Sequence, residues 1–376
     1  MQWTSTVSVS PDLETAVAEV GDAVRAELGD ATPHLLIAFI SPHHSGAFER
    51  LPALIQSRVG GGLLLGCSAG GVIGGGREVE NRPALSLTAA VLPGVTVEPL
   101  RVDPEKPEAP DVTAENPQLV LLPDPFSVDT ESVVQALDAT FPNATTVGGL
   151  ASGGQRPGSN ALYLGGETHR GGLVGVALSG DVVVDTIVAQ GCRPIGEPMF
   201  VTRCERNVVH ALDGRPALAV VRDLRSRATP VDEALFRTSL FLGIVMTAGR
   251  ESYRQGDFLV RNIIGADPSN GAMAVGTLVE EGMVVQFHLR DAATSAADLE
   301  SLLGRYEGTP AGALLFSCLG RGAGLYGSPD HDTNAFRTRL GPVPLGGFFC
   351  NGEIGPVHGT TFLHGYTSAF GLFHGR

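Results

Sequence analysis

The residues best suited to chemistry lie in one short stretch near the end of the chain, residues 346–357, with the sequence GGFFCNGEIGPV. This stretch places a thiol (Cys350), an amide (Asn351) and a carboxylate (Glu353) close together among four glycines and a proline. Because glycine has no side chain, the backbone and these polar groups could approach a bound molecule closely. The composition predicts either one wall of a ligand site or a catalytic patch.

Two other stretches are similar to this one: LLLGCSAGGVIGG at residues 63–75 and TTVGGLASGG at residues 145–154. Aligning GVIG of the first with GEIG of residues 352–355 places Gly66 on Gly347. A strand that ends in a glycine-rich loop is therefore predicted three times. Any one of these loops is explained by a tight turn, but three in one chain favour loops that converge on a site.

Catalysis is an alternative interpretation of these motifs. Ser68 lies at the centre of G-x-S-x-G, the nucleophile elbow of serine hydrolases. A strand precedes Ser68, but glycines follow it where that motif needs a helix. A thiol nucleophile, Cys350 or Cys318, would need a lowered pKa and a neighbouring base. A hydrolase therefore stays an alternative, and no catalytic residue is assigned.

Polar residues also interrupt apolar strands elsewhere. Arg261 and Asn262 lie within FLVRNIIG, while Cys318 and Arg321 lie at the end of ALLFSCLGRG. Burying a guanidinium or amide without a partner is costly, so each should meet a carboxylate or a ligand. Glu353 is the expected internal partner for an arginine. The alternative is a small anionic or zwitterionic ligand held by arginine and loop amides.

The sequence contains only weak matches to the motifs that bind cofactors or metals. GAGLYG at residues 322–327 matches G-x-G-x-x-G, but SPD follows where a dinucleotide site needs a helix. The five cysteines are widely spaced without a C-x-x-C pair, which argues against a zinc site or a disulfide framework. No metal or cofactor is predicted, although haem ligation by one axial histidine leaves no spacing signal and stays open.

Composition limits the class of protein. A length of 376 residues predicts two or three domains. The net charge of −14 argues against a nucleic-acid partner, which calls for a basic face. The N-terminus lacks the pattern of a signal peptide, and no apolar run approaches the ~18–20 residues that span a bilayer. We expect a cytoplasmic protein with reduced thiols and no membrane partner.

The periodicity of apolar residues predicts mixed α and β structure. A helix capped by Ser10 should run to residue 28, and residues 232–245 and 334–340 should also be helical. Residues 103–117 form an acidic, proline-rich connection. Glycine-bounded strands fill much of the rest. The predicted class is α+β, with two hairpin-rich modules, mixed sheets packed together and helices outside, an αββα-like layering.

Taken in order, six motifs of the chain resemble those of the FIST domains: GCSAGGVIGGGREVE, VGGLAS, QGCRPIG, FLVRNIIG, FSCLGRG and GGFFCNGEIGP. The resemblance runs from about Ala31 to the C-terminus. It implies a FIST-N module at residues 31–215, a FIST-C module at residues 216–376, and an N-terminal helix within residues 1–30 that packs on the first module.

The resemblance also implies a role in sensing or signal transduction. Small-molecule binding, with amino acids suggested, has been proposed for bacterial members, and some are associated with haem and gas sensing. Eukaryotic members act as adaptors in ubiquitin ligation, so a protein-interaction adaptor and a haem-binding gas sensor are alternatives for this chain. We expect no F-box, kinase domain or methyl-accepting helical region in this sequence, so we expect a separate signalling protein, such as a histidine kinase or a cyclic-dinucleotide enzyme, to receive its signal. The candidate ligand-binding residues are Cys67, Ser68, Arg261, Asn262, Cys318, Arg321, Asn351 and Glu353.

Overall fold

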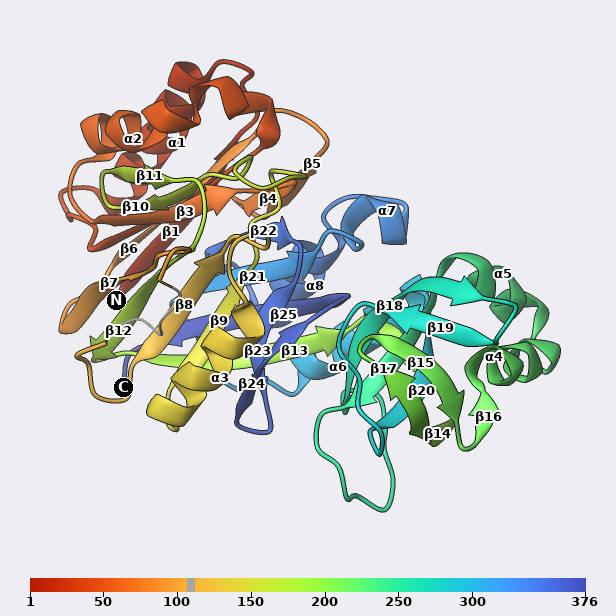
Figure 1. The fold of residues 1–376 in the computed structure, drawn as a ribbon. Coiled ribbons are helices and arrows are strands. Elements are labelled where there is room, and N and C mark those ends of the chain that lie inside the picture. Colours follow the sequence, from red (N-terminus) through yellow and green to blue (C-terminus); the bar gives the residue numbers. More distant parts are fainter. Residues whose placement is uncertain (107–111) are drawn as a thin grey trace. The chain divides into compact units, whose positions relative to one another are not determined.

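The computed structural model describes residues 1–106 and 112–376, and its chain divides into two compact units (Figure 1). The larger unit consists of Met1–Val188 and Glu300–Arg376, and the smaller unit is the inserted segment Ala189–Leu299. Residues 107–111, in the predicted acidic connection, lie outside the described residues. With 25% helix and 42% strand in mixed sheets, the α+β class is confirmed.

The first helix, α1 (Leu13–Leu28), begins two residues later than predicted. Asp12 caps it, because its side chain accepts a hydrogen bond from the backbone N–H of Thr15 at 2.8 Å. Gly29 ends the helix with φ near +60°, a conformation that favours glycine. Strand β1 (Gln2–Ser8), which periodicity did not indicate, precedes the helix.

Three six-stranded sheets make up the larger unit, rather than the two that layering suggested. In order across the first sheet lie β1, β6 (Leu85–Val91), β2 (Leu35–Ile40), β3 (Leu63–Ser68), β10 (Leu162–Leu164) and β11 (Glu167–His169). The second contains β24 (Thr360–His364), β23 (Glu353–Val357), β9 (Thr145–Gly149), β8 (Gln118–Pro123), β12 (Leu173–Gly180) and β7 (Val95–Val102). The third contains β13 (Val183–Gln190), β25 (Thr367–His374), β21 (Gly312–Cys318), β22 (Leu345–Cys350), β4 (Gly71–Gly74) and β5 (Arg77–Glu80).

Each sheet is built around the same unit of chain. Two parallel strands, β2 and β3, β8 and β9, or β21 and β22, are joined by a helical connection. A hairpin then follows, and the last strand (β6, β12 or β25) returns antiparallel beside the first. The connecting helices are η1 (Pro42–Arg50) and α2 (Leu51–Val59), α3 (Thr130–Thr140), and α7 (Gly322–Tyr326) with α8 (His331–Leu340).

The hairpins are exchanged in a cycle among the three sheets. Hairpin β4–β5 pairs with β22 of the third sheet, β23–β24 pairs with β9 of the second, and β10–β11 pairs with β3 of the first. No sheet is therefore complete without the hairpin of another repeat. The chain of the larger unit thus forms three structural repeats in a pseudo-threefold arrangement, and the smaller unit is inserted into the third repeat after β13.

Three glycines occupy the same position in these repeats. A Cβ atom on Gly66, Gly148 or Gly347 would lie about 2 Å from a backbone carbonyl oxygen of the neighbouring parallel strand. No side chain fits such a space, so these positions require glycine. The predicted match of Gly66 with Gly347 is confirmed, and Gly148 completes the set.

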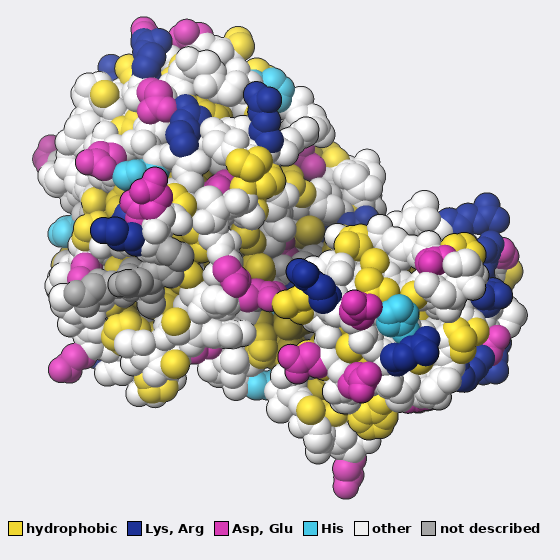
Figure 2. Space-filling view, viewed as in Figure 1, with side chains coloured by type: hydrophobic (Ala, Val, Ile, Leu, Met, Phe, Trp, Pro, Cys, Tyr) yellow, Lys and Arg dark blue, Asp and Glu magenta, His cyan; other side chains and the backbone are white. Residues whose placement is uncertain are grey.

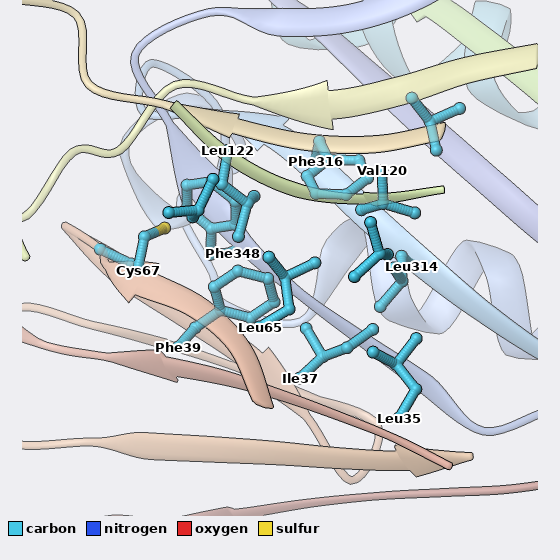
Figure 3. Packing of buried hydrophobic residues seen from close by; sticks show 14 of the residues in the cluster. Leu35, Ile37, Phe39, Leu65, Cys67, Val120, Leu122, Leu314, Phe316 and Phe348 are labelled. Carbon is cyan, nitrogen blue, oxygen red and sulfur yellow. The ribbon is translucent and has the colours of Figure 1, made fainter. Parts of the chain in front are cut away.

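One core lies between the three sheets. It takes Leu35, Ile37 and Phe39 from the first sheet, Val120 and Leu122 from the second, and Leu314, Phe316 and Phe348 from the third (Figure 3). Outside the first sheet, α1 and α2 bury their apolar faces, and α3 does so on the second. The helices therefore lie on the outside, as predicted.

The smaller unit is a closed barrel. Strand β14 pairs with β20 along one edge and with β15 along the other. The pairing of β14 with β15 closes the sheet into a barrel. Its strands are β14 (Cys192–Glu205), β20 (Val284–Arg290), β17 (Leu240–Val245), β18 (Phe258–Asp267), β19 (Ala272–Val275), β15 (Val208–Leu212) and β16 (Arg215–Pro216), and its helices are α4 (Ala217–Ser226), α5 (Pro230–Thr238) and most of α6 (Ala292–Gly304).

The prediction of one helix over residues 232–245 is wrong. Helix α5 ends at Thr238, and β17 then runs antiparallel between β18 and β20. Apolar residues of β17 such as Leu242 face the barrel core, so burial in a sheet overrode the helical spacing. Among residues 1–106 and 112–376, none of the helices has the length and apolar content that crossing a membrane requires.

Candidate functional site

The three glycine-rich loops that follow β3, β9 and β22 meet at one end of the larger unit. Ser152 Oγ accepts a hydrogen bond from Gly70 N at 2.9 Å and donates one to Phe349 O at 2.5 Å. The backbone N–H of Asn351 donates to Leu150 O at 3.1 Å. These bonds join all three loops. We call residues 68–71, 150–154 and 350–353 the loop junction.

Register distinguishes Glu353 from the equivalent residues of the other two repeats. Val72, Leu162 and Glu353 each pair with the residue that follows the close-packed glycine of the neighbouring repeat. The three residues are therefore structurally equivalent. Two repeats place an aliphatic side chain there, and the third places a carboxyl group.

Glu353 is completely buried. Its Oε2 accepts hydrogen bonds from the Thr367 backbone N–H at 2.9 Å and hydroxyl at 2.7 Å. Its Oε1 lies 3.5 Å from the Cys350 thiol, a weak donor, and so keeps acceptor capacity. Burial raises the pKa of Glu353 to about 7, although the Thr367 bonds and the charge of Arg321 favour the ionised form.

Arg321 is also buried, but its carboxylate partner is Asp332 and the predicted pairing with Glu353 is wrong. Its Nε donates to Asp332 Oδ2 at 2.9 Å and a terminal nitrogen donates to Oδ1 at 3.1 Å, a two-point ion pair. That nitrogen also donates to Tyr326 Oη at 2.7 Å. The guanidinium is thus engaged within the protein, which weakens its predicted role in holding an anionic ligand.

Asp332 is the most heavily bonded carboxylate near this site. It also accepts from Ser368 Oγ at 2.5 Å, and His331 Nδ1 lies 2.9 Å from Oδ1. Burial alone would raise the pKa of Asp332, but the Arg321 charge and these bonds hold it well below the ordinary value. Asp332 was not among the predicted residues, because α8 carried no motif that marked it.

A second carboxyl beside this ion pair also escaped prediction. Glu78 lies in the charged cluster REVE after the first glycine loop, and its Oε1 accepts from Thr333 N at 2.8 Å. Its Oε2 is buried, with no hydrogen-bond partner among the described residues. Burial raises the pKa of Glu78 to about 7, and the negative charge of Asp332 adds to the effect. The clustering of charges after a glycine loop was the signal that could have marked Glu78.

The proposed nucleophiles lack the surroundings that catalysis needs. Ser68 Oγ donates to Asn160 Oδ1 at 3.0 Å and accepts from Ala161 N at 3.0 Å, and neither partner is a base. Burial raises the pKa of the Cys350 thiol well above its ordinary value, and burial with the Glu353 charge raises that of Cys318 to about 12. The geometry therefore gives a hydrolase no support.

The predicted residues are divided between the two compact units. Cys67, Ser68, Cys318, Arg321, Asn351 and Glu353 belong to the larger unit. Cys67 lies buried in β3, whereas Asn351 is exposed at the edge of the loop junction and its Nδ2 donates to Ala151 O at 3.2 Å. Arg261 and Asn262 lie in β18 of the smaller unit.

Three pockets of the described residues are lined by residues other than these. Two in the larger unit, of about 250 and 530 Å³, are lined by residues near Pro342 and near Asp185, and one of about 480 Å³ lies in the smaller unit. Within the described ranges, no cluster of three or more His, Cys, Asp or Glu side chains could hold a metal ion.

Comparison with known proteins agrees with the motifs. The family model for the FIST N domain matches residues 34–215, and that for the FIST C domain matches residues 217–356. Uncharacterized protein Rv0628c of Mycobacterium tuberculosis is 39% identical over 379 residues, covering 98% of both chains. Uncharacterized protein Mb0898c of Mycobacterium bovis is 35% identical over 379 residues, covering 98% of this chain and 97% of its own.

The boundary between the two family modules falls inside the smaller unit, because residues 215–217 lie within Ala189–Leu299. Each module therefore contributes chain to both compact units. The motifs, the repeated glycine loops and the two matched models agree, and we conclude that this chain belongs to the FIST family, whose domains are associated with signal transduction and small-molecule sensing.

Proposed function

We propose that this protein is a cytoplasmic sensory protein that binds a small molecule at the loop junction of its larger unit. The observation that carries the proposal is Glu353, a buried carboxyl at a position where the equivalent residues are Val72 and Leu162. Burying a carboxyl costs free energy that an aliphatic residue would not. Because the fold accepts an aliphatic residue there, a function explains the carboxyl better than stability does.

The proposed ligand is a small metabolite that carries an amino group, such as an amino acid. Its ammonium group would donate to Glu353 Oε1, whose present contact is the Cys350 thiol. The exposed Asn351 and the backbone of the glycine loops would bind the polar remainder. A cation beside Glu353 favours its ionised form, so binding should tighten as the pH rises through about 7.

Ligand entry would also give the sensor its signal. Glu353 has no exposed surface, so an ammonium group reaches it only when the loops separate. The hydrogen bonds of Ser152 that join the loops would then break or shift, and all three repeats would respond. A separate signalling protein such as a histidine kinase would receive this change, and the charge of −14 fits a partner other than nucleic acid.

A thermal-shift screen of amino acids and other amines tests the proposal. Trp3 is the only tryptophan, is buried in the larger unit and contacts Phe373 at 4.7 Å between ring centroids, so its fluorescence follows this unit. We expect at least one compound to raise the melting temperature of the wild type.

The same compound should fail to stabilise Glu353→Gln and should stabilise Asn351→Ala less. Asn334→Ala, which alters an exposed asparagine of α8 outside the loop junction, is the matched control and should respond like the wild type. Absence of any stabilising amine, or equal stabilisation of Glu353→Gln, would contradict the proposal.

A further inference from the structure

The pocket of about 480 Å³ in the smaller unit lies between β14, α4 and α5. Its volume is within the range of small-molecule sites, roughly 300–1,000 Å³. Apolar side chains form much of its wall, among them Ile195, Met199, Leu224 and Phe236. None of the candidate residues of the loop junction lines it.

One side of this pocket is formed by an irregular part of β14. This strand pairs with β20 up to Ile195 and again from Met199, and the residues between them leave the regular ladder. Gln286 Nε2 holds this bulge by donating to Gly196 O at 2.6 Å. Gly196 has a φ of +66°, and a Cβ there would lie 2.5 Å from Leu224 Cδ2 of α4. The bulge therefore lies closely against α4 because residue 196 is glycine.

Most charges around the pocket are already paired. Asp223 forms an ion pair with Arg215, and Asp232 forms one with Arg193, which also binds Asp291 at 2.8 Å. These pairs leave little net charge on that part of the wall.

Arg227 differs from the paired arginines. It lines the pocket and is exposed, and no carboxylate in the described part of the chain lies within ion-pair distance of it. Arginines gather over α4 and α5 in a protein that is acidic overall (Figure 2). The pKa of Asp223 is lowered first by its bond to Arg215 and further by the charges of Arg227 and Arg222.

We propose that this pocket binds an organic carboxylate with an apolar body. The carboxylate would accept two hydrogen bonds from the planar guanidinium of Arg227, and the body would cover Ile195, Leu224 and Phe236. Glu197, on the bulge, also lines the pocket, and its carboxylate opposes an anion. The site differs in unit and in ligand charge from the loop junction, so the two proposals stand or fall separately.

Calorimetric titration of the full chain with decanoate tests this site, with decanol as the uncharged analogue. We expect decanoate to bind the wild type more tightly than decanol. Arg227→Gln should weaken decanoate binding about tenfold, the effect of losing about 1.4 kcal/mol. Glu197→Gln should strengthen it, and Ala228→Phe, which places a ring in the pocket wall, should abolish it.

Two controls separate the outcomes. Arg203→Gln removes an exposed arginine of the same barrel that does not line the pocket, and it should bind decanoate like the wild type. Glu353→Gln should also bind normally. Circular dichroism confirms that each variant is folded. No binding of decanoate to the wild type, or equal affinity of Arg227→Gln and Arg203→Gln, would overturn the proposal.

Discussion

Replacing Glu353 by glutamine should make the larger unit more stable at alkaline pH. Glutamine keeps an oxygen that can accept both hydrogen bonds from Thr367, but it carries no proton to lose. Glu353 has an ordinary pKa of 4.5 and a pKa of about 7 in the folded protein. Between these pH values the folded state holds a proton that the unfolded state releases, so the stability of the wild type falls as the pH rises.

The magnitude follows from these two pKa values. One pKa unit corresponds to about 1.4 kcal/mol, so ionised Glu353 costs the folded state roughly 3 kcal/mol at pH 8. At pH 5 the cost is only about 1 kcal/mol, because folded-state Glu353 remains protonated. Glu353→Gln should therefore gain roughly 2 kcal/mol over the wild type between pH 5 and pH 8.

Urea unfolding followed by Trp3 fluorescence at the two pH values measures this difference for the larger unit. Glu307→Gln, at an exposed position of the same unit, is the matched control and should show no such pH dependence. If the stability difference between Glu353→Gln and the wild type is the same at pH 5 and pH 8, Glu353 does not titrate in this range and the argument fails.

Other predictions follow from the same packing. Gly347→Ala should destabilise the larger unit by about 3 kcal/mol or more, since its Cβ would lie 1.9 Å from a carbonyl oxygen, whereas Gly324→Ala in open space should be nearly neutral by urea unfolding. Asp332→Asn should cost about 3–5 kcal/mol in the same assay, because it leaves the buried Arg321 charge without its carboxylate; a loss below about 1 kcal/mol would contradict the buried pair. Iodoacetamide labelling read by mass spectrometry should modify three thiols only after unfolding, those of Cys67, Cys192 and Cys350.

The sequence predicted the glycine loops because their requirement is local. Gly66 and Gly347 lie against a neighbouring strand in a way that excludes any side chain, so the same short motif recurs where the same contact recurs. The mixed α+β class followed from apolar periodicity for similar reasons. Long-range pairing left no comparable signal: the cyclic exchange of hairpins and the closure of the barrel depend on residues far apart in the chain.

Side-chain partners were harder to predict than elements. Arg321 needed a buried carboxylate, and the motif offered Glu353, but the fold supplied Asp332 from α8, eleven positions after Arg321. Only the strand register shows that Glu353 is equivalent to Val72 and Leu162, and therefore that a carboxyl group replaces an aliphatic side chain at this position. Residues 240–245 show the same limit, since their apolar spacing fits a helix while the barrel uses them as a strand.

Hydrogen exchange followed by mass spectrometry, with and without the amine selected by the thermal-shift screen, tests the central claim most directly. Exchange of backbone amides in residues 68–71, 150–154 and 350–353 should change together in the wild type, since Ser152 couples the three loops. The same amine should leave Glu353→Gln unchanged. Ligand-dependent changes confined to other segments, or unchanged exchange in all three loops, would contradict a ligand site at the loop junction.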